Sequence, residues 1–282
     1  MFLLSLLLAI TACSDPVKNG SISIHVIHEV GDQPLVTDTL CHVNEAGNKY
    51  LVNEVQWFLS NLELEDQQSH WTTLAATWYV DTDLPETTTL CIKEIPVGHY
   101  QSLHFTFGLC DTDNQSGSFP NPPESNMFWP DELGGGYHYM KLNGKYLTDD
   151  NLLAPLAIHL GRGQNEGLTE FYDNSFTVEL PIDLTVVEGT GSIVGLVMNI
   201  DNWFRNPNTY DFNDFGSAIM QNQKAQQLLK ENGTDVFSIK TNNDMESPLK
   251  TTVQLLHKAA PKPHFMTLEN FKKTISNIKD SL

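Results

Sequence analysis

The residues best suited to chemistry surround a run of three glycines. The stretch SNMFWPDELGGGYHYMKLNG, residues 125–144, places Met127 and Trp129 before Gly134–Gly136 and His138 after them. Imidazole nitrogen binds copper in either charge state, and thioether sulfur favours Cu(I). The stretch is therefore either a turn between two strands or part of a metal site.

The second half of this stretch alternates like a strand. Residues an even number apart share one face of a strand. This spacing predicts His138, Met140 and Leu142 on the inward face, with Tyr137 and Tyr139 facing outward.

Two other histidines also stand where a strand meets a polar or glycine-rich loop. In SISIHVIHEV, His28 ends the core-facing row that begins at Ile22, whereas in LAIHLG, His159 faces away from Ile158 and Leu160. Strand alternation thus predicts an inward His28 and a His159 at a rim or cleft.

The sequence lacks the common catalytic and nucleotide-binding patterns. It contains no GxSxG, Walker A or GxGxxG motif. The DTDNQSG run at 111–117 begins like a calcium loop, but Pro122 occupies the twelfth position, where such a loop needs an acid. An Asx-rich turn is favoured there, and the chain is not expected to be an enzyme.

The charge excludes one class of partner. The formal net charge is -19, which argues against nucleic acid or anionic lipid binding through the body of the protein. The last 45 residues differ, because they hold 7 lysines against 4 acidic residues. This tail is expected to lie against the acidic body or to reach a partner.

The N-terminus predicts export. MFLLSLLLAITAC is uncharged and apolar, and it is shorter than the roughly 20 residues that a membrane span needs. Its ending, ITAC, resembles a bacterial lipobox, which implies a signal peptide over 1–12, lipid attachment to Cys13 and a tether over 13–20. The expected location is the bacterial cell envelope, on a lipid anchor; the alternative is an ordinary secreted protein.

Three cysteines remain, Cys41, Cys91 and Cys110. Exported chains occupy a disulfide-permissive compartment, so one bridge and one free thiol are expected, with the pairing left open. A thiolate copper ligand is less favoured, since there is no CxxC spacing.

The elements that must position these residues are mostly strands. Period-two patterns cover residues 21–30, 102–110 and 175–182, and GSIVGLVMNI at 191–200 is apolar on both faces, as in a central strand. Helical spacing is confined to 214–232, with Asp214 as N-cap, and to 266–282. The fold class is mainly β, an antiparallel β-sandwich over 21–240 with a few short helices, mostly C-terminal, and a Lys-rich helical extension over 241–282.

Six segments, in order, resemble the MbnP-like copper-binding family. They are VIHEVGDQPL, YLVNEVQWFLSNLEL, IPVGHYQSLHFTFGL, MFWPDELGGGYHYMKLNG, LAIHLG and IDNWF. This family includes exported proteins of methane oxidisers linked to methanobactin and lipoproteins of other bacteria.

The resemblance implies a copper site. Matched by position, His28, His159 and Trp129 correspond to family residues around the metal, and Met127 is a candidate sulfur donor. In some members this tryptophan is oxidised to kynurenine by a partner dihaem cytochrome c peroxidase, and the product helps to hold copper. Many relatives carry a second tryptophan or a histidine two residues after it; this chain has Asp131 there.

The sequence thus predicts a lipoprotein that captures or hands over copper, with affinity falling below about pH 6.5, where free imidazole protonates. Two alternatives stay open. One is an interaction lipoprotein on the same fold without metal; the other is a peroxidase substrate in which Trp129 is modified for another purpose.

Overall fold

The fold is taken from a computed structural model that describes residues 18–110, 112–215 and 218–240. Cys13 and the predicted signal peptide, most of the tether, and the C-terminal extension with its predicted helix lie outside these residues. The described part contains no helix that is long and apolar enough to span a membrane.

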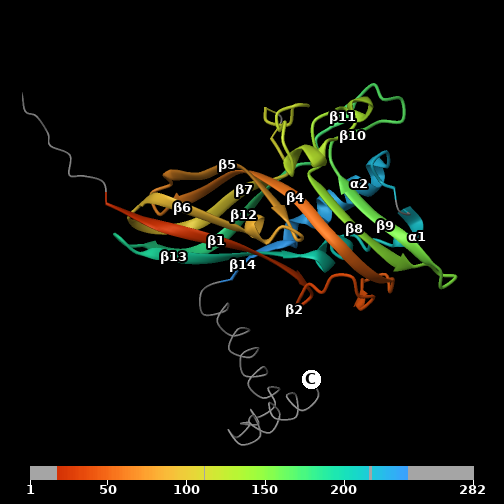
Figure 1. The fold of residues 1–282 in the computed structure, drawn as a ribbon, viewed down its shortest axis with the longest axis horizontal. Coiled ribbons are helices and arrows are strands. Elements are labelled where there is room, and N and C mark those ends of the chain that lie inside the picture. Colours follow the sequence, from red (N-terminus) through yellow and green to blue (C-terminus); the bar gives the residue numbers. More distant parts are fainter. Residues whose placement is uncertain (1–17, 111, 216–217, 241–282) are drawn as a thin grey trace, which may run out of the picture. The chain divides into compact units, whose positions relative to one another are not determined.

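Two large sheets make up this part of the chain, which confirms a mainly β sandwich (Figure 1). The five-stranded sheet has the order β14 (Phe237–Lys240), β13 (Gly191–Asn199), β1 (Asn19–Val30), β2 (Gln33–Pro34), and β6 (Thr89–Pro96) also pairs with β1. The seven-stranded sheet has the order β12 (Phe176–Val186), β7 (Gly98–Phe107), β4 (Lys49–Asp66), β8 (Met140–Leu147), β9 (Leu153–Leu160), and β3 (His42–Val43) and β5 (Trp71–Asp81) also pair with β4.

One pairing departs from the antiparallel expectation. β1 and β13 run parallel, from Ser21 beside Gly191 to Glu29 beside Asn199, whereas the other ladders between named strands are antiparallel. β13 lies between β1 and β14 and is buried from Val194 to Met198, as its apolar sequence predicted.

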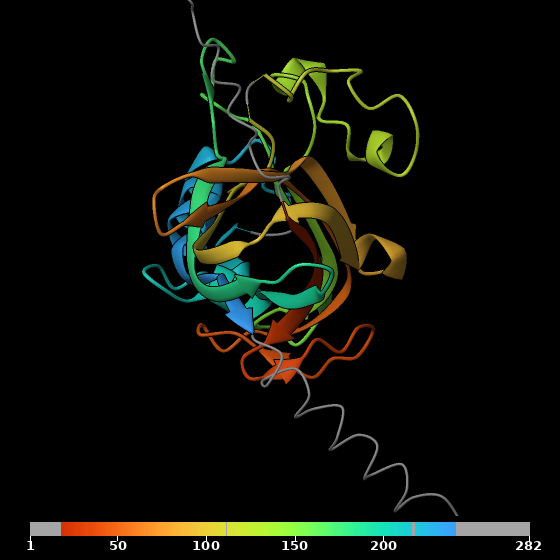
Figure 2. The same cartoon turned by 90° about the vertical axis from the view of Figure 1, so that its left-hand side faces the viewer.

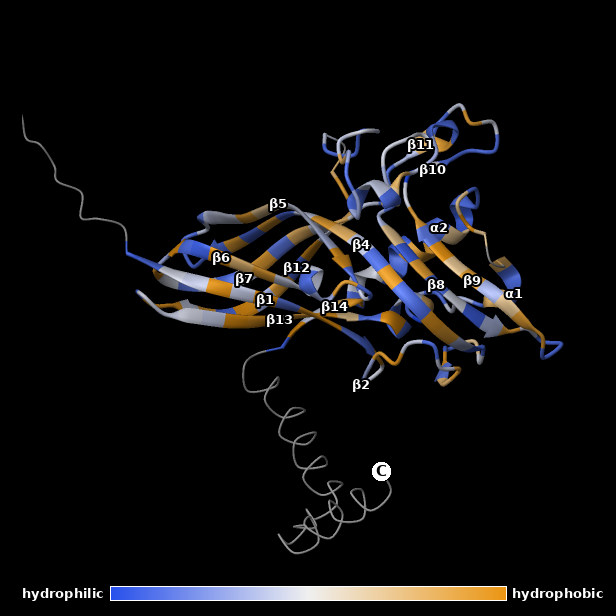
Figure 3. Cartoon of the chain, in the orientation of Figure 1, coloured by the Kyte–Doolittle hydropathy of each residue, from blue (hydrophilic) through white to orange (hydrophobic). Residues whose placement is uncertain are grey.

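The core lies between the two sheets. Strands alternate between polar and apolar residues, and the bands of Figure 3 follow this period. Trp57 and Phe107 of the seven-stranded sheet meet Phe237 of the other, with ring centroids 5.5 and 5.9 Å from that of Phe237. Viewed from one end, in Figure 2, the sheets curve around this shared interior.

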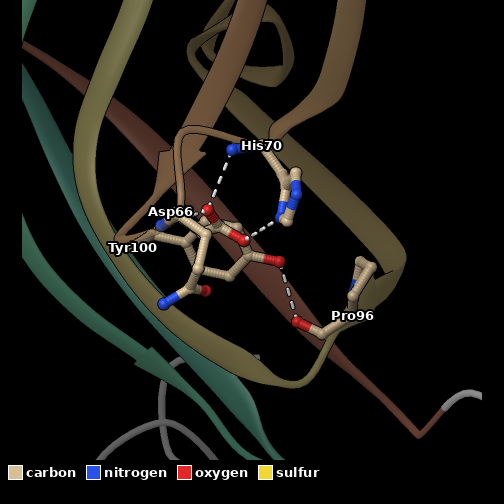
Figure 4. Close-up of polar contacts among 5 residues, drawn as sticks. Asp66, His70, Pro96 and Tyr100 are labelled. Atoms are coloured by element: carbon tan, nitrogen blue, oxygen red, sulfur yellow. Dashed lines mark hydrogen bonds and ion pairs between the residues drawn. The ribbon is translucent and has the colours of Figure 1, made fainter.

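The turn from β4 to β5 is closed by a carboxylate (Figure 4). Asp66 accepts hydrogen bonds from the backbone amides of Gln68 and His70 at 2.8 and 2.9 Å, and its second oxygen lies 3.1 Å from the His70 imidazole. These bonds, that of the His70 amide first, lower the pKa of Asp66. Beside it, the Tyr100 hydroxyl donates to the Pro96 carbonyl at 2.8 Å and so ties β7 to the end of β6.

The predicted helix over 214–232 is shorter than expected. α1 covers Phe212–Phe215, and α2 covers Gln223–Asn232, with Asn222 as the N-cap that accepts from the Ala225 amide. Asp214 therefore lies inside α1 rather than capping a long helix. The short 3-10 helices are η1 (Pro85–Thr88), η2 (Glu124–Met127), η3 (Asp131–Leu133), η4 (Ile200–Phe204) and η5 (Gly233–Asp235).

The segment between β7 and β8 covers the outer face of β4. There Phe58 packs against Phe119 and Tyr137, with ring centroids 5.3 and 6.3 Å away. In consequence Tyr137 and Tyr139 are buried, and the prediction that they face outward is wrong. Strand alternation holds only from Met140 onward, because the residues before it belong to this covering segment.

Candidate metal centre

A tight hairpin precedes β8 and carries Trp129 and His138 on its two arms. The His138 amide donates to the Met127 carbonyl at 2.6 Å, and the Trp129 amide donates to the Gly136 carbonyl at 2.9 Å. Gly134, Gly135 and Gly136 all have positive φ, which glycine adopts without steric cost. The glycine run therefore folds the chain back so that Trp129 and His138 become neighbours.

His138 presents one buried nitrogen without a partner. Its Nδ1 lies 2.9 Å from the Met127 carbonyl, and because a carbonyl only accepts, Nδ1 must carry the proton. Nε2 then holds a lone pair, and among the described residues it meets no hydrogen-bond partner. Burial lowers the pKa of His138 to about 3, and the charges of His159 and Lys141 act in the same direction.

Two side chains, Asn143 and Glu54, hold His159 in the tautomer opposite to that of His138, with the proton on Nε2. Its Nε2 lies 2.8 Å from Oδ1 of Asn143, and Nδ2 of Asn143 donates to Oε1 of Glu54 at 2.9 Å. A carboxylate only accepts, so Glu54 fixes the amide orientation and Asn143 must accept from His159. Nδ1 of His159 is left with the lone pair. Burial, and then the charge of Lys141, lower its pKa to about 4.

The two imidazoles lie at a spacing that suits a shared metal ion. Their ring centroids are 5.1 Å apart and their planes are 86° apart. A metal bonded to two imidazoles at about 2.0 Å implies centroids roughly 4.5–6.4 Å apart for bond angles between about 90 and 180°. Both rings are neutral and each keeps one nitrogen for a ligand, so the donor chemistry fits copper.

Trp129 packs against the His138 ring. The two ring centroids are 4.7 Å apart, and the indole Nε1 donates to the Leu133 carbonyl at 3.0 Å. Trp129 is fully buried, and it packs on Gly161, where an added Cβ would lie 2.5 Å from the indole Cε3. Only a residue without a side chain permits this approach at the end of β9.

A pocket of about 430 Å³ opens beside His159. Its walls are mostly apolar and include Pro130, Leu133, Ile219 and Met220. His159 projects from the face of β9 opposite the buried Ile158, as its alternation predicted. The pocket therefore gives His159 a route to the surface.

The structure does not bring His28 to this centre. His28 accepts a hydrogen bond from the Trp57 indole at 3.1 Å, and Trp57 is in register with Met140, on the buried face of the seven-stranded sheet. His159 projects from the other face of the same sheet. The prediction that His28 and His159 share one site is therefore corrected. Burial lowers the pKa of His28 to about 4, while the charge of Asp81 opposes this shift.

Met127 contributes through its backbone. Its side chain is fully buried in the core, and the contact that it makes with His138 is through the carbonyl oxygen. Asp131, where the family pattern places a histidine or tryptophan, accepts from the Ser116 hydroxyl at 2.7 Å, and so anchors the hairpin.

The three described cysteines are free, so the expected disulfide is not present. Each thiol lies next to a different group: Cys41 beside His42, Cys91 beside Ser23 and Cys110 beside Thr112.

Among the residues that the structure describes, no group of three or more His, Cys, Asp or Glu side chains is placed to hold a metal ion. The centre offers two histidines, beside Trp129.

Sequence reasoning missed the role of His138 and both side chains that orient His159. His138 was recognisable as a histidine directly after the glycine turn, close in sequence to Trp129. Asn143 and Glu54 carry no local signal, because their contacts join β9 to β8 and β8 to β4.

Comparisons with known proteins give one family and one fold. A family model described as MbnP matches residues 19–222. The solved structure of MbnP from Methylosinus trichosporium matches with a TM-score of 0.54 and 14% sequence identity, over 80% of this chain and 100% of that one. Identity this low shows a shared fold. No curated protein matches the sequence.

Proposed function

Because the chain belongs to the MbnP family, we propose that it binds copper between His138 and His159, beside Trp129, and serves in capture or handover of the ion. The observation that carries the proposal is a buried and a half-buried neutral imidazole side by side, each with one nitrogen bonded to a fixed partner and the other left as a donor. Copper is the cargo of this protein and not a catalytic cofactor.

This proposal revises the ligand set and keeps the chemistry predicted from sequence. His138 replaces His28 as a proposed ligand. Many relatives carry a histidine or a second tryptophan at the position of Asp131, and here His138 provides a histidine from the other arm of the same hairpin. Fixed partners on both rings reduce the reorganisation that metal binding requires, which supports tight binding.

The cellular setting is proposed from the sequence. We place the protein in the bacterial cell envelope, with lipid on the Cys13 thiol. Cys13→Ala in the full chain should then abolish partitioning into a detergent phase, while a variant of the same tether, Ser14→Ala, should partition normally.

Copper titration of the purified protein tests the function. His138→Ala and His159→Ala should each weaken copper binding at least roughly 100-fold. His28→Ala should leave it within about threefold, since His28 contacts Trp57 on the face of the seven-stranded sheet opposite to His159. His99, on β7, serves as a control, and His99→Ala should also leave binding unchanged. Loss of copper binding in His28→Ala alone would overturn this ligand set.

Two other outcomes favour the alternative functions. Protein that takes up no copper and gains no thermal stability from it would favour an interaction lipoprotein on the same fold. Native protein whose intact mass shows Trp129 converted to kynurenine, but which binds no copper, would favour a substrate of a dihaem peroxidase. Kynurenine together with copper would extend the ligand set to position 129.

A further inference from the structure

Three turns of the sandwich gather where the chain enters β1. The Val97 amide, between β6 and β7, donates to the Lys18 carbonyl at 2.9 Å, and the Gly189 amide, between β12 and β13, donates to the Asn19 carbonyl at 3.1 Å. β4 and β7 pair as far as Asp66, so the turn from β4 to β5 lies at this end too. This end, which we call the tether end, lies at the left of Figure 1 and faces the viewer in Figure 2.

The tips of two of these turns are apolar. Val97 and Val187 are 44% and 50% exposed. Exposed turns are mostly built from Gly, Pro, Asn, Asp and Ser, so valine at two tips needs a physical reason. Trp71, the first residue of β5, and Ile193, near the start of β13, are also exposed at this end. The tether end therefore presents apolar side chains from two turns and from both sheets.

The anchor proposed at Cys13 holds this end close to a bilayer. Asn19, the first residue of β1, follows Cys13 by only six residues. An extended chain spans at most about 3.5 Å per residue, so the start of β1 lies within roughly 20 Å of a lipidated Cys13. β4, which runs from Lys49 to Asp66 at the tether end, is about 55 Å long. The anchor therefore distinguishes between the two ends of the sandwich.

We propose that the tether end docks onto the lipid surface that holds the anchor, with Val97 and Val187 among the lipid headgroups. This inference rests on the proposed lipidation of Cys13. Apolar side chains gain free energy on leaving water, and tryptophan favours the membrane–water interface, which suits Trp71. A small contact is sufficient, because the anchor makes docking an intramolecular event.

Charge at the tether end does not favour anionic lipid. Lys18 is paired with Glu188 at 3.1 Å, and the net charge of the chain is -19. Apolar turns need no anionic headgroup, so a zwitterionic surface of phosphatidylcholine is the expected partner.

Docking at this end keeps the metal centre clear of the lipid. Met140, which follows the histidine hairpin, is in register with Trp57, nine residues before Asp66 on β4. Nine residues of strand span about 30 Å. The pocket beside His159 is then held away from the headgroups, where a soluble partner reaches it.

Broadening by a spin label tests the docking. The full-length lipidated protein, with valine methyl groups labelled in carbon-13, is placed in phosphatidylcholine nanodiscs that contain lipids with a nitroxide on the headgroup. The methyl resonances of Val97 and Val187 should broaden. Those of Val36 and Val43 should stay sharp, although these side chains are 49% and 52% exposed, because Val43 pairs with Lys49 at the opposite end of β4.

A substitution at one turn should weaken the contact of the other. Val97→Glu places a charge in the contact, and desolvating a charge is costly, so the broadening at Val187 should fall at least roughly twofold. Val43→Glu is the matched control, since it adds the same charge at an exposed valine of the opposite end, and it should leave the broadening unchanged.

The outcomes separate this inference from the proposals on which it depends. If intact mass shows lipid on the protein and the Val97 and Val187 resonances stay sharp, the docking is wrong and the anchor stands. If these resonances change instead with the concentration of the Cys13→Ala protein, the turns form a contact between two copies, which also overturns the inference. Protein without lipid on Cys13 overturns the anchor and the docking together, and leaves copper binding to its own titration.

Discussion

The ring centres of His138 and His159 are 5.1 Å apart, and the two imidazoles keep opposite nitrogens free of a proton. His138 donates through Nδ1 and keeps Nε2, whereas His159 donates through Nε2 and keeps Nδ1. Each tautomer is dictated by a partner that can only accept, directly for His138 and through Asn143 for His159. Both tautomers are therefore set by the protein itself.

The partner of His159 gives the first prediction. Asn143→Leu removes the acceptor that orients the ring, and loss of such an outer-shell partner costs about 10- to 100-fold in metal affinity. The expected result is a weaker copper affinity in that range, measured by chelator competition. Asn53→Leu on β4 is the control, because Asn53 bonds to Asp38 and not to the centre. Equal affinities for the two variants would show that Asn143 does not orient the ligand.

Copper binding should persist in acid. Protons compete with copper only below the pKa of the folded ligands, and those of His138 and His159 are lowered to about 3 and about 4. We therefore expect copper affinity to hold down to about pH 4.5 and then to fall steeply. This revises the sequence-based expectation of a fall below pH 6.5. An affinity that already declines between pH 7 and 6 would contradict the burial of the pair.

The lowered pKa of His138 should also make the stability of the metal-free protein depend on pH. Its unfolded state binds a proton at His138 near pH 6.5, whereas the folded state does so near pH 3, so stability is lost as pH falls between these values. At pH 5 the loss from this residue is about 2 kcal/mol. His138→Gln should flatten the pH dependence of the free energy of unfolding in this window. His99→Gln, a change to a partly exposed histidine, should not flatten it.

The contact between Trp129 and Gly161 gives a prediction about stability. Gly161→Ala places a methyl group against the indole, and overpacking of a filled interior costs typically about 1–3 kcal/mol. Gly167→Ala is the control, since the nearest atoms to its added Cβ lie 3.7 Å away. Chemical unfolding followed by tryptophan fluorescence compares the two. A Gly161→Ala protein as stable as the parent would mean that Trp129 has room to move.

The strands were predictable because each carries its own burial pattern. β1 reads as alternating residues, and β13 reads as an apolar run whose successive residues from Val194 to Met198 are buried on both faces. The same local logic failed at Tyr137 and Tyr139, since both belong to the segment that packs over the outer face of β4. It also failed between α1 and α2, where the buried Ile219 and the pocket-lining Met220 continue a helical spacing through a turn.

The sequence by itself determined the fold class and the family, because strand periodicity, turn residues and the order of motifs are all written along the chain. It also placed His159 at a rim or cleft, where the structure has a pocket. Only the tertiary structure decided which donors meet. His28, on β1 of the five-stranded sheet, contacts Trp57 on the inner face of the seven-stranded sheet, whereas His159 projects from the outer face of that sheet, and three glycines turn His138 toward Trp129. Periodicity reports which face a side chain occupies, but it carries no information on which segments, distant in sequence, pack over that face.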